Sequence, residues 1–299
     1  MARIPVTKTP KVYVGGQFIR SESGRVFPVR EAGRGKGEAG SGKKEGGLLG
    51  NIPQCTRKDL RNAVEAAAKA GPDWAQRTPY NRGQIIYRLA EMLESRSAEM
   101  ADALVISGAA TKAAAAKEVV AAVDRLIYYA GWSDKYGALL GTVNPVASNY
   151  FDFSVPEPTG VVGIVAPETQ DFLGLVSHLA PVIVAGNAAV VLLSEKHPLV
   201  SLEFAEILAT SDLPAGVANL ISGRKDELVS HLARHMDVNA IADAGGDKAM
   251  SKAIQADAAV NVKRVKAYRI ADYFSDDAQG LDFIESFTET KTTWHPIGV

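Results

Sequence analysis

Hydrophobic residues change their spacing about halfway along the chain. Between residues 56 and 136 they recur every three or four positions, which predicts amphipathic helices. From residue 161 onward they form short continuous runs, the pattern of strands buried on both faces of a sheet. These runs are Val161 to Val165, Ala188 to Leu193 and Val217 to Ile221. Helical spacing in 172–185 and 199–211 separates them, so the order predicts an α/β fold with a doubly wound parallel sheet.

The first half is expected to supply a layer of helices. Thr56 and Asp59 have the spacing of a capping hydroxyl and an acid three residues later, which predicts a helix that begins there and runs to Ala70. The segment 82–103 keeps its apolar residues on one face and predicts a second helix. The Ala-rich segment 111–136 predicts a third.

Further strands are predicted on either side of these elements. Short β-branched and aromatic runs within 11–29, separated by Gly and Ser, predict a hairpin. Alternation begins again at Tyr150. A fourth sheet strand is expected at 239–242, followed by a helix at 248–256, and Thr-rich alternation at 283–294 predicts a late edge strand.

We divide the chain into four parts on this basis. Residues 1–140 form a hairpin and helical layer, 141–157 a β-ribbon arm, 158–270 a Rossmann-like doubly wound sheet, and 271–299 a tail with a terminal strand. Residues 30–47 are almost purely Gly, Lys, Arg, Glu and Ser and are expected to form a flexible surface loop. Acidic residues interleave the basic ones without any aromatic, which favours a solvated linker over a basic binding patch.

Charge and composition limit the classes of molecule to which the chain is expected to bind. Thirty-three basic against 34 acidic residues leave a net charge of −1, so we expect no attraction to nucleic acid or to an anionic membrane. No apolar run reaches the ~20 residues of a membrane helix, and the first residues lack a secretory core. The single cysteine, Cys55, excludes an intramolecular disulfide and suits a reducing compartment. A cytoplasmic location is expected.

Five short motifs in the second half carry the most specific signal. They are Glu157-Pro-Thr-Gly-Val-Val-Gly-Ile-Val-Ala-Pro167, Ala180-Pro-Val-Ile-Val-Ala-Gly-Asn187, Ser194-Glu195, Leu213-Pro-Ala-Gly-Val-Ala-Asn-Leu-Ile-Ser-Gly223 and His235-Met-Asp-Val238. Their order and spacing resemble the aldehyde dehydrogenase superfamily, over most of residues 11–266. The ending from Phe287 resembles the terminal strand of that family, which pairs across a subunit interface. The resemblance implies a dinucleotide-binding fold and an assembly arm.

Aldehyde oxidation in that family implies residues that this chain lacks. The reaction needs a thiolate, oxyanion donors, a general base and a nicotinamide. Cys55 lies away from the family's catalytic motifs and is expected to be structural, the alternative being a thiolate activated at a helix N-terminus. Pro167-Glu168-Thr169-Gln170 replaces the turn that carries the family's oxyanion Asn, which leaves Thr169 as a weak donor. Tyr268 stands where the general-base Glu would be, so no catalytic residue is assigned.

Only a short tail follows Tyr268. The resemblance therefore implies a truncated member without the catalytic-cysteine domain, similar to the non-catalytic second module of two-module aldehyde dehydrogenases. His231 and His235 lie four residues apart but lack a cysteine or acid at metal-site spacing, so a surface pair is favoured and no metal is predicted.

Seven residues remain as a degenerate candidate site for the family's NAD(P) cofactor. They are Pro167, Thr169, Ser194, Glu195, Gly223, Gly245 and Gly246. The resemblance implies that Glu195 keeps the acid that grips the adenosine ribose, whereas the Lys of that turn is missing, which weakens binding by about 1.5–3 kcal/mol. Asp243 and Asp247 flank the two glycines and would repel a phosphate. We therefore expect no cofactor, with NAD(P) as the alternative.

These features together predict a relative of aldehyde dehydrogenases that has kept its interfaces and lost its chemistry. We expect an inactive assembly or interaction subunit that forms a homo-oligomer or a hetero-complex with a full-length aldehyde dehydrogenase. Two alternatives stay open: an active NAD(P)-dependent aldehyde oxidoreductase, and a module that binds a nucleotide without reacting.

Overall fold

The computed structural model describes residues 8–31 and 47–298, and a seven-stranded mixed sheet lies at its centre. Five of its strands are parallel, in the order β11-β10-β7-β8-β9. They are β7 (Val161–Val165), β8 (Ala188–Leu192), β9 (Ala218–Ile221), β10 (Ala240–Asp243) and β11 (Arg264–Ala267). Every residue of β7 to β10 is buried, which explains the unbroken apolar runs. The predicted doubly wound parallel sheet is confirmed.

The N-terminal hairpin extends this sheet. β1 (Val12–Val14) and β2 (Gln17–Ile19) pair antiparallel, and β1 also pairs with β9 through Tyr13 and Leu220. The main sheet therefore contains strands from both halves of the chain.

The second half of the predicted hairpin finds a different partner. β3 (Val26–Arg30) pairs with β4 (Leu48–Pro53) in a separate two-stranded sheet. Arg30, which the composition placed in a loop, thus ends a strand. Residues 32–46 of that predicted loop lie outside the described residues.

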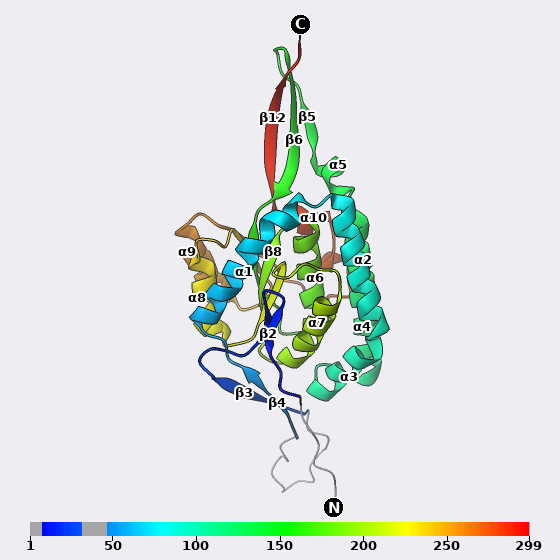
Figure 1. Ribbon diagram of the computed structural model, residues 1–299, viewed down its shortest axis with the longest axis vertical. Coiled ribbons are helices and arrows are strands. Elements are labelled where there is room, and N and C mark those ends of the chain that lie inside the picture. Colours follow the sequence, from blue (N-terminus) through cyan, green and yellow to red (C-terminus); the bar gives the residue numbers. More distant parts are fainter. Residues whose placement is uncertain (1–7, 32–46, 299) are drawn as a thin grey trace, which may run out of the picture.

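Helices cover both faces of the main sheet (Figure 1). One face carries α1 (Arg57–Gln76), α8 (Lys225–Arg234) and α9 (Lys248–Ala259), and the other carries α6 (Asp171–Val184) and α7 (Pro198–Thr210). A third layer packs outside α6 and α7, formed by α2 (Pro79–Ser95), α3 (Ser97–Ser107) and α4 (Lys112–Trp132). None of the helices in the described ranges has the length and apolar content to cross a membrane.

Several helices differ from their predicted bounds, and the helix predicted at 111–136 ends at Trp132. The helix predicted at 82–103 is interrupted at Arg96 (φ −111°, ψ 18°), and this break lets α3 contact α7. Helix α1 starts as predicted, since the Asp59 carboxylate accepts the Thr56 backbone N–H at 2.7 Å, but it continues through Pro72.

A three-stranded antiparallel sheet projects from the body (Figure 1). It consists of β5 (Thr142–Asn144), β6 (Tyr150–Pro158) and β12 (Thr288–Pro296), and we call it the arm. The short helices α5 (Tyr136–Leu140) and α10 (Leu281–Glu285) lead into β5 and β12, with a 3-10 turn at Asp276–Ala278 before α10.

The terminal strand starts later than predicted. Phe283 and Ile284, which we assigned to the strand, are buried against the body within α10, and β12 begins only at Thr288. The Thr-rich stretch does form an edge strand, but every residue after Thr288 is exposed, so burial does not alternate along it.

Candidate functional site

The seven predicted site residues follow four neighbouring strands of the parallel sheet. Pro167 and Thr169 come after β7, Ser194 and Glu195 after β8, Gly223 after β9, and Gly245 and Gly246 after β10. The carboxyl ends of parallel strands meet at one edge, and the strand order reverses between β7 and β10. Open α/β sheets bind ligands at such an edge. We call this region the crevice.

Glu168, a residue that the sequence did not single out, lies in the turn after β7 and bonds the turns after β8 and β9. Its carboxylate accepts hydrogen bonds from Ser194 Oγ (2.9 Å) and from the backbone N–H groups of Glu195 (3.2 Å) and Lys196 (3.3 Å). It also pairs with the Lys225 ammonium, whose side chain is 3% exposed and which donates to the Ala166 carbonyl as well.

Electrostatics keep this carboxylate charged. Burial alone would raise the pKa of Glu168, but the Lys225 ammonium, the Ser194 hydroxyl and the Glu195 N–H together hold the pKa below its usual value. A buried ammonium and a partly buried carboxylate therefore form an internal ion pair between the turns after β7 and β9.

Glu195 is also bonded within the chain. Its carboxylate accepts the Lys225 backbone N–H at 2.7 Å and pairs with the Arg224 guanidinium at 2.7 Å. The acid that the resemblance assigned to a ribose thus holds the start of α8 instead.

The glycine turn after β10 is closed in a similar way. The Asp243 carboxylate accepts the Gly245 N–H at 3.2 Å and lies 3.3 Å from Arg269 Nη2. Asp247 caps α9 by accepting the Met250 N–H at 2.8 Å. Both acids were expected to repel a phosphate. In the structure Asp243 is bonded to a cation, and Asp247 is bonded to the start of a helix.

The residues in the crevice do not fit NAD(P). Glu168 and Lys225 fill the space between the turns after β7, β8 and β9, and Asp247 takes a backbone donor at the start of α9. The resemblance places the ribose-binding ammonium at Leu192, which is apolar, and Thr169 is exposed, with no hydrogen bond into the crevice within the described residues. We derive no chemical step through this cofactor.

Cys55 has a packing role. It is fully buried, and burial together with the Asp59 carboxylate raises the pKa of its thiol to about 12. A Cβ on Gly223 would lie 3.2 Å from the Cys55 carbonyl oxygen and 2.9 Å from Leu228 Cδ1, so this glycine serves close packing. The thiol stays protonated at neutral pH, which supports the structural interpretation of Cys55.

Tyr268, at the position of the family's general base, belongs to a buried ring cluster. Its ring stacks on Phe283 at 4.8 Å and lies 4.6 Å from the His178 ring, and burial raises the pKa of its hydroxyl. His178 is bonded through Nε2 to Tyr273 Oη at 2.9 Å, and burial, with a contribution from Arg125, lowers its pKa to about 3. Both rings are neutral at pH 7, and the tail residues Tyr273 and Phe283 cover them.

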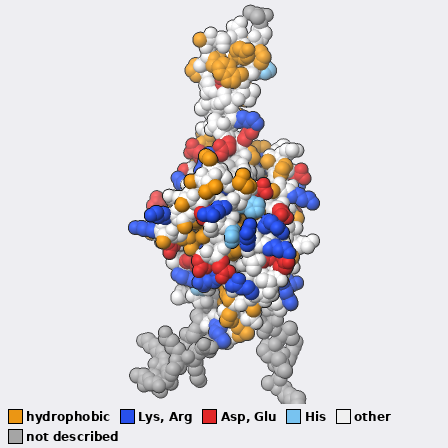
Figure 2. Space-filling model, turned by 90° about the vertical axis from the view of Figure 1, so that its left-hand side faces the viewer, with side chains coloured by type: hydrophobic (Ala, Val, Ile, Leu, Met, Phe, Trp, Pro, Cys, Tyr) orange, Lys and Arg blue, Asp and Glu red, His pale blue; other side chains and the backbone are white. Residues whose placement is uncertain are grey.

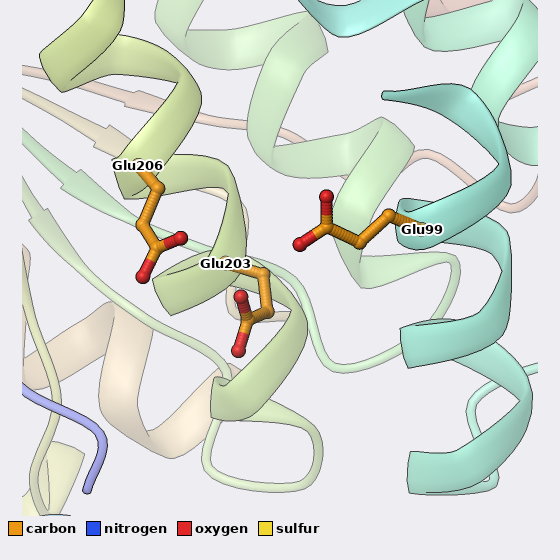
Figure 3. Close-up of side chains that lie close together, drawn as sticks. All are labelled: Glu99, Glu203 and Glu206. Carbon is orange, nitrogen blue, oxygen red and sulfur yellow. The ribbon is translucent and has the colours of Figure 1, made fainter. Parts of the chain in front are cut away.

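Three acidic residues of α3 and α7 lie close together. Glu203 and Glu206 of α7 and Glu99 of α3 point toward one another (Figure 3). Lys8 Nζ lies 2.7 Å from Glu203 and 2.5 Å from Glu206, and Arg96 pairs with Glu99 at 2.7 Å. This arrangement is an ion-pair network that ties α3 to α7, and we assign no metal to it.

Comparison with known proteins matches the family model described as "Aldehyde dehydrogenase family" to residues 42–268. Omega-crystallin from Enteroctopus dofleini is 27% identical over 88% of this chain and 51% of that protein. An aldehyde dehydrogenase from Aspergillus niger is 29% identical over 85% of this chain and 48% of that protein. The crystal structure of an NAD-dependent aldehyde dehydrogenase from Sinorhizobium meliloti, 25% identical, superposes with a TM-score of 0.79 over 88% of this chain and 50% of that one.

The chain spans about half the length of the curated relatives it matches. The family model covers more than half of the chain itself, and the observed sheet agrees with it. This chain belongs to the aldehyde dehydrogenase family.

Proposed function

We propose that this chain is a catalytically inactive aldehyde dehydrogenase family protein of the cytoplasm, and that it acts by assembly. Its partner is a second copy of itself or a full-length aldehyde dehydrogenase. The proposal rests chiefly on the arm, whose apolar side chains have no covering layer within the described part of the chain.

The arm exposes large apolar side chains near its free end, where Figure 2 shows a hydrophobic group. The most exposed are Val143 (67%) and Trp294 (57%), and Tyr150 packs edge-on against Trp294 at 5.7 Å. Eight of the nine residues of β12 are exposed. A three-stranded sheet open on both faces gains stability from a covering partner, and an exposed apolar group of this kind marks an interaction site.

Catalytic inactivity is supported by three positions. The thiol of Cys55 is buried and protonated, Thr169 offers one exposed hydroxyl where the family has an Asn, and Tyr268 carries a buried neutral phenol where the family has a carboxylate base. None of these groups supplies an activated nucleophile or a base at neutral pH.

The alternatives, an active NAD(P)-dependent oxidoreductase and a nucleotide-binding module, require a crevice that admits a dinucleotide. The ion pair of Glu168 with Lys225 argues against both. Calorimetric titration of NAD and NADP separates the three functions, because micromolar binding to the unmodified protein would favour the alternatives.

Assembly is tested on the arm. We expect the pure protein to self-associate in sedimentation analysis, or to co-purify with a full-length aldehyde dehydrogenase from the same cell. The double substitution Tyr150→Ser and Trp294→Ser is expected to weaken that association at least tenfold, about 1.4 kcal/mol. Tyr87→Ser, at an exposed tyrosine of α2, is the matched control and should leave association unchanged. A monomer that captures no dehydrogenase would contradict the proposal.

A further inference from the structure

The turns after β8 and β9 direct four donors at one point. These donors are Ser194 Oγ, the backbone N–H groups of Glu195 and Lys196, and Lys225 Nζ. The Ser194 and Lys225 side chains are 2% and 3% exposed, so the polar groups are set into the body and not on its surface. A hydroxyl, two adjacent backbone N–H groups and a buried ammonium form a donor set suited to the oxygens of a phosphate.

The present occupant of these donors comes from a third turn. Glu168 lies in the loop 167–170 between β7 and α6, and all four donors bond its carboxylate. We propose that the four donors form an anion-binding cradle that the chain fills with its own Glu168, so that Glu168 and a phosphate group compete for one site. The proposal is independent of assembly through the arm.

The loop that carries Glu168 is held in place by side chains at both ends. Gln170 has a left-handed backbone (φ 47°, ψ 42°), a conformation that costs a residue with a side chain about 1–2 kcal/mol. Its side-chain oxygen accepts the Tyr273 N–H at 2.7 Å, and its amide donates to Asp272 at 3.0 Å. The loop is thus strained and is kept in the crevice by the cradle on one side and by the tail on the other.

The surrounding charges are compatible with an anion in place of Glu168. The nearest remaining carboxylate, Glu195, is neutralised by Arg224 at 2.7 Å. Without Glu168, Lys225 would be a buried ammonium with no counter-ion, which is strongly unfavourable. A phosphate group would restore both the charge and the four hydrogen bonds. Glu168 therefore acts as an intramolecular ligand that closes the crevice.

The test uses inorganic phosphate as the probe, with chloride at equal ionic strength as the reference. Glu168→Ala is expected to lower the melting temperature in chloride, and phosphate should restore much of the loss. Calorimetry should give phosphate a Kd at least tenfold lower for this variant than for the unmodified protein. Adding Lys225→Met to Glu168→Ala should abolish the response. A folded Glu168→Ala protein that responds to phosphate no more than the unmodified chain would overturn the proposal.

A matched control is Glu118→Ala. Glu118 is a buried carboxylate that accepts the Leu173 N–H at 3.1 Å, and the cradle donors do not bond it. Its loss should not be restored by phosphate; equal rescue of both variants would also overturn the proposal. Glu168→Gln covers the case in which Glu168→Ala does not fold. It keeps the volume of the side chain and removes the charge, so phosphate should bind it several-fold more tightly than the unmodified protein, and unchanged affinity would count against the cradle.

Discussion

The crevice and the arm differ in whether their side chains have partners within the described part of the chain. In the crevice, the polar groups that a ligand would need are bonded to one another, with Lys225 paired to Glu168 and Glu195 held by Arg224. In the arm, apolar groups such as Trp294 remain exposed. A region that has satisfied its own donors offers little to a small molecule, whereas an uncovered sheet gains from a protein partner. This contrast is the reason that we propose the arm as the surface for assembly.

The largest effect is expected from breaking the buried ion pair of the crevice. Lys225→Met leaves the Glu168 carboxylate partly buried without its cation, which should lower the free energy of unfolding by about 3–5 kcal/mol. Urea unfolding at pH 7 measures this change. The double variant with Glu168→Gln should recover much of the loss. Wild-type stability of Lys225→Met alone would show that the crevice is not closed by this pair.

A smaller effect on the free energy of unfolding is expected from lowering the pH, because His178 is buried in its neutral form. Its pKa is lowered by burial to about 3, below the unfolded value of 6.5, so the unfolded chain takes up the proton first as pH falls. This contribution to stability is complete above pH 6.5 and is lost between pH 6.5 and 3, by about 1.4 kcal/mol per pH unit at most. Urea unfolding across this range should show a steeper pH dependence for the unmodified protein than for His178→Phe. Parallel curves would contradict the assignment.

The smallest effect is expected from an ion pair in the arm. Lys291 Nζ lies 3.0 Å from the Glu157 carboxylate, but both side chains are about half exposed. Lys291→Ala should change the free energy of unfolding by less than about 1 kcal/mol, and salt should reduce even that. A loss as large as that of Lys225→Met would mean that the arm is covered in solution, which would sharpen the case for assembly.

The sequence predicted those elements whose signal is local. Unbroken apolar runs marked β7 to β9, and the Thr56 to Asp59 spacing marked the start of α1. Pairing between distant segments left no such signal. Nothing near Val26 indicates that β3 pairs with β4 across residues 32–46, or that β1 joins the sheet at β9.

The contacts of the crevice also join segments that are distant in the sequence, so they left no local signal. Glu168 and Lys225 are separated by 57 positions, and neither of them was assigned to the site from the sequence. Only the sheet, by bringing the two turns to one edge, shows that this acid and this base form a pair. Opposite charges in neighbouring strand-end turns were the available signal.

The pairing of β1 with β9 joins two segments that the ribosome makes at very different times. Tyr13 pairs with Leu220, so the N-terminal hairpin leaves the ribosome long before its neighbour in the sheet exists. At roughly 5–20 residues per second, the interval is on the order of 10–40 s. During that time Val12 and Val14, buried in the finished protein, have no strand to cover them. Among the strands of the main sheet, β1 therefore waits longest for a neighbour that comes later in the chain.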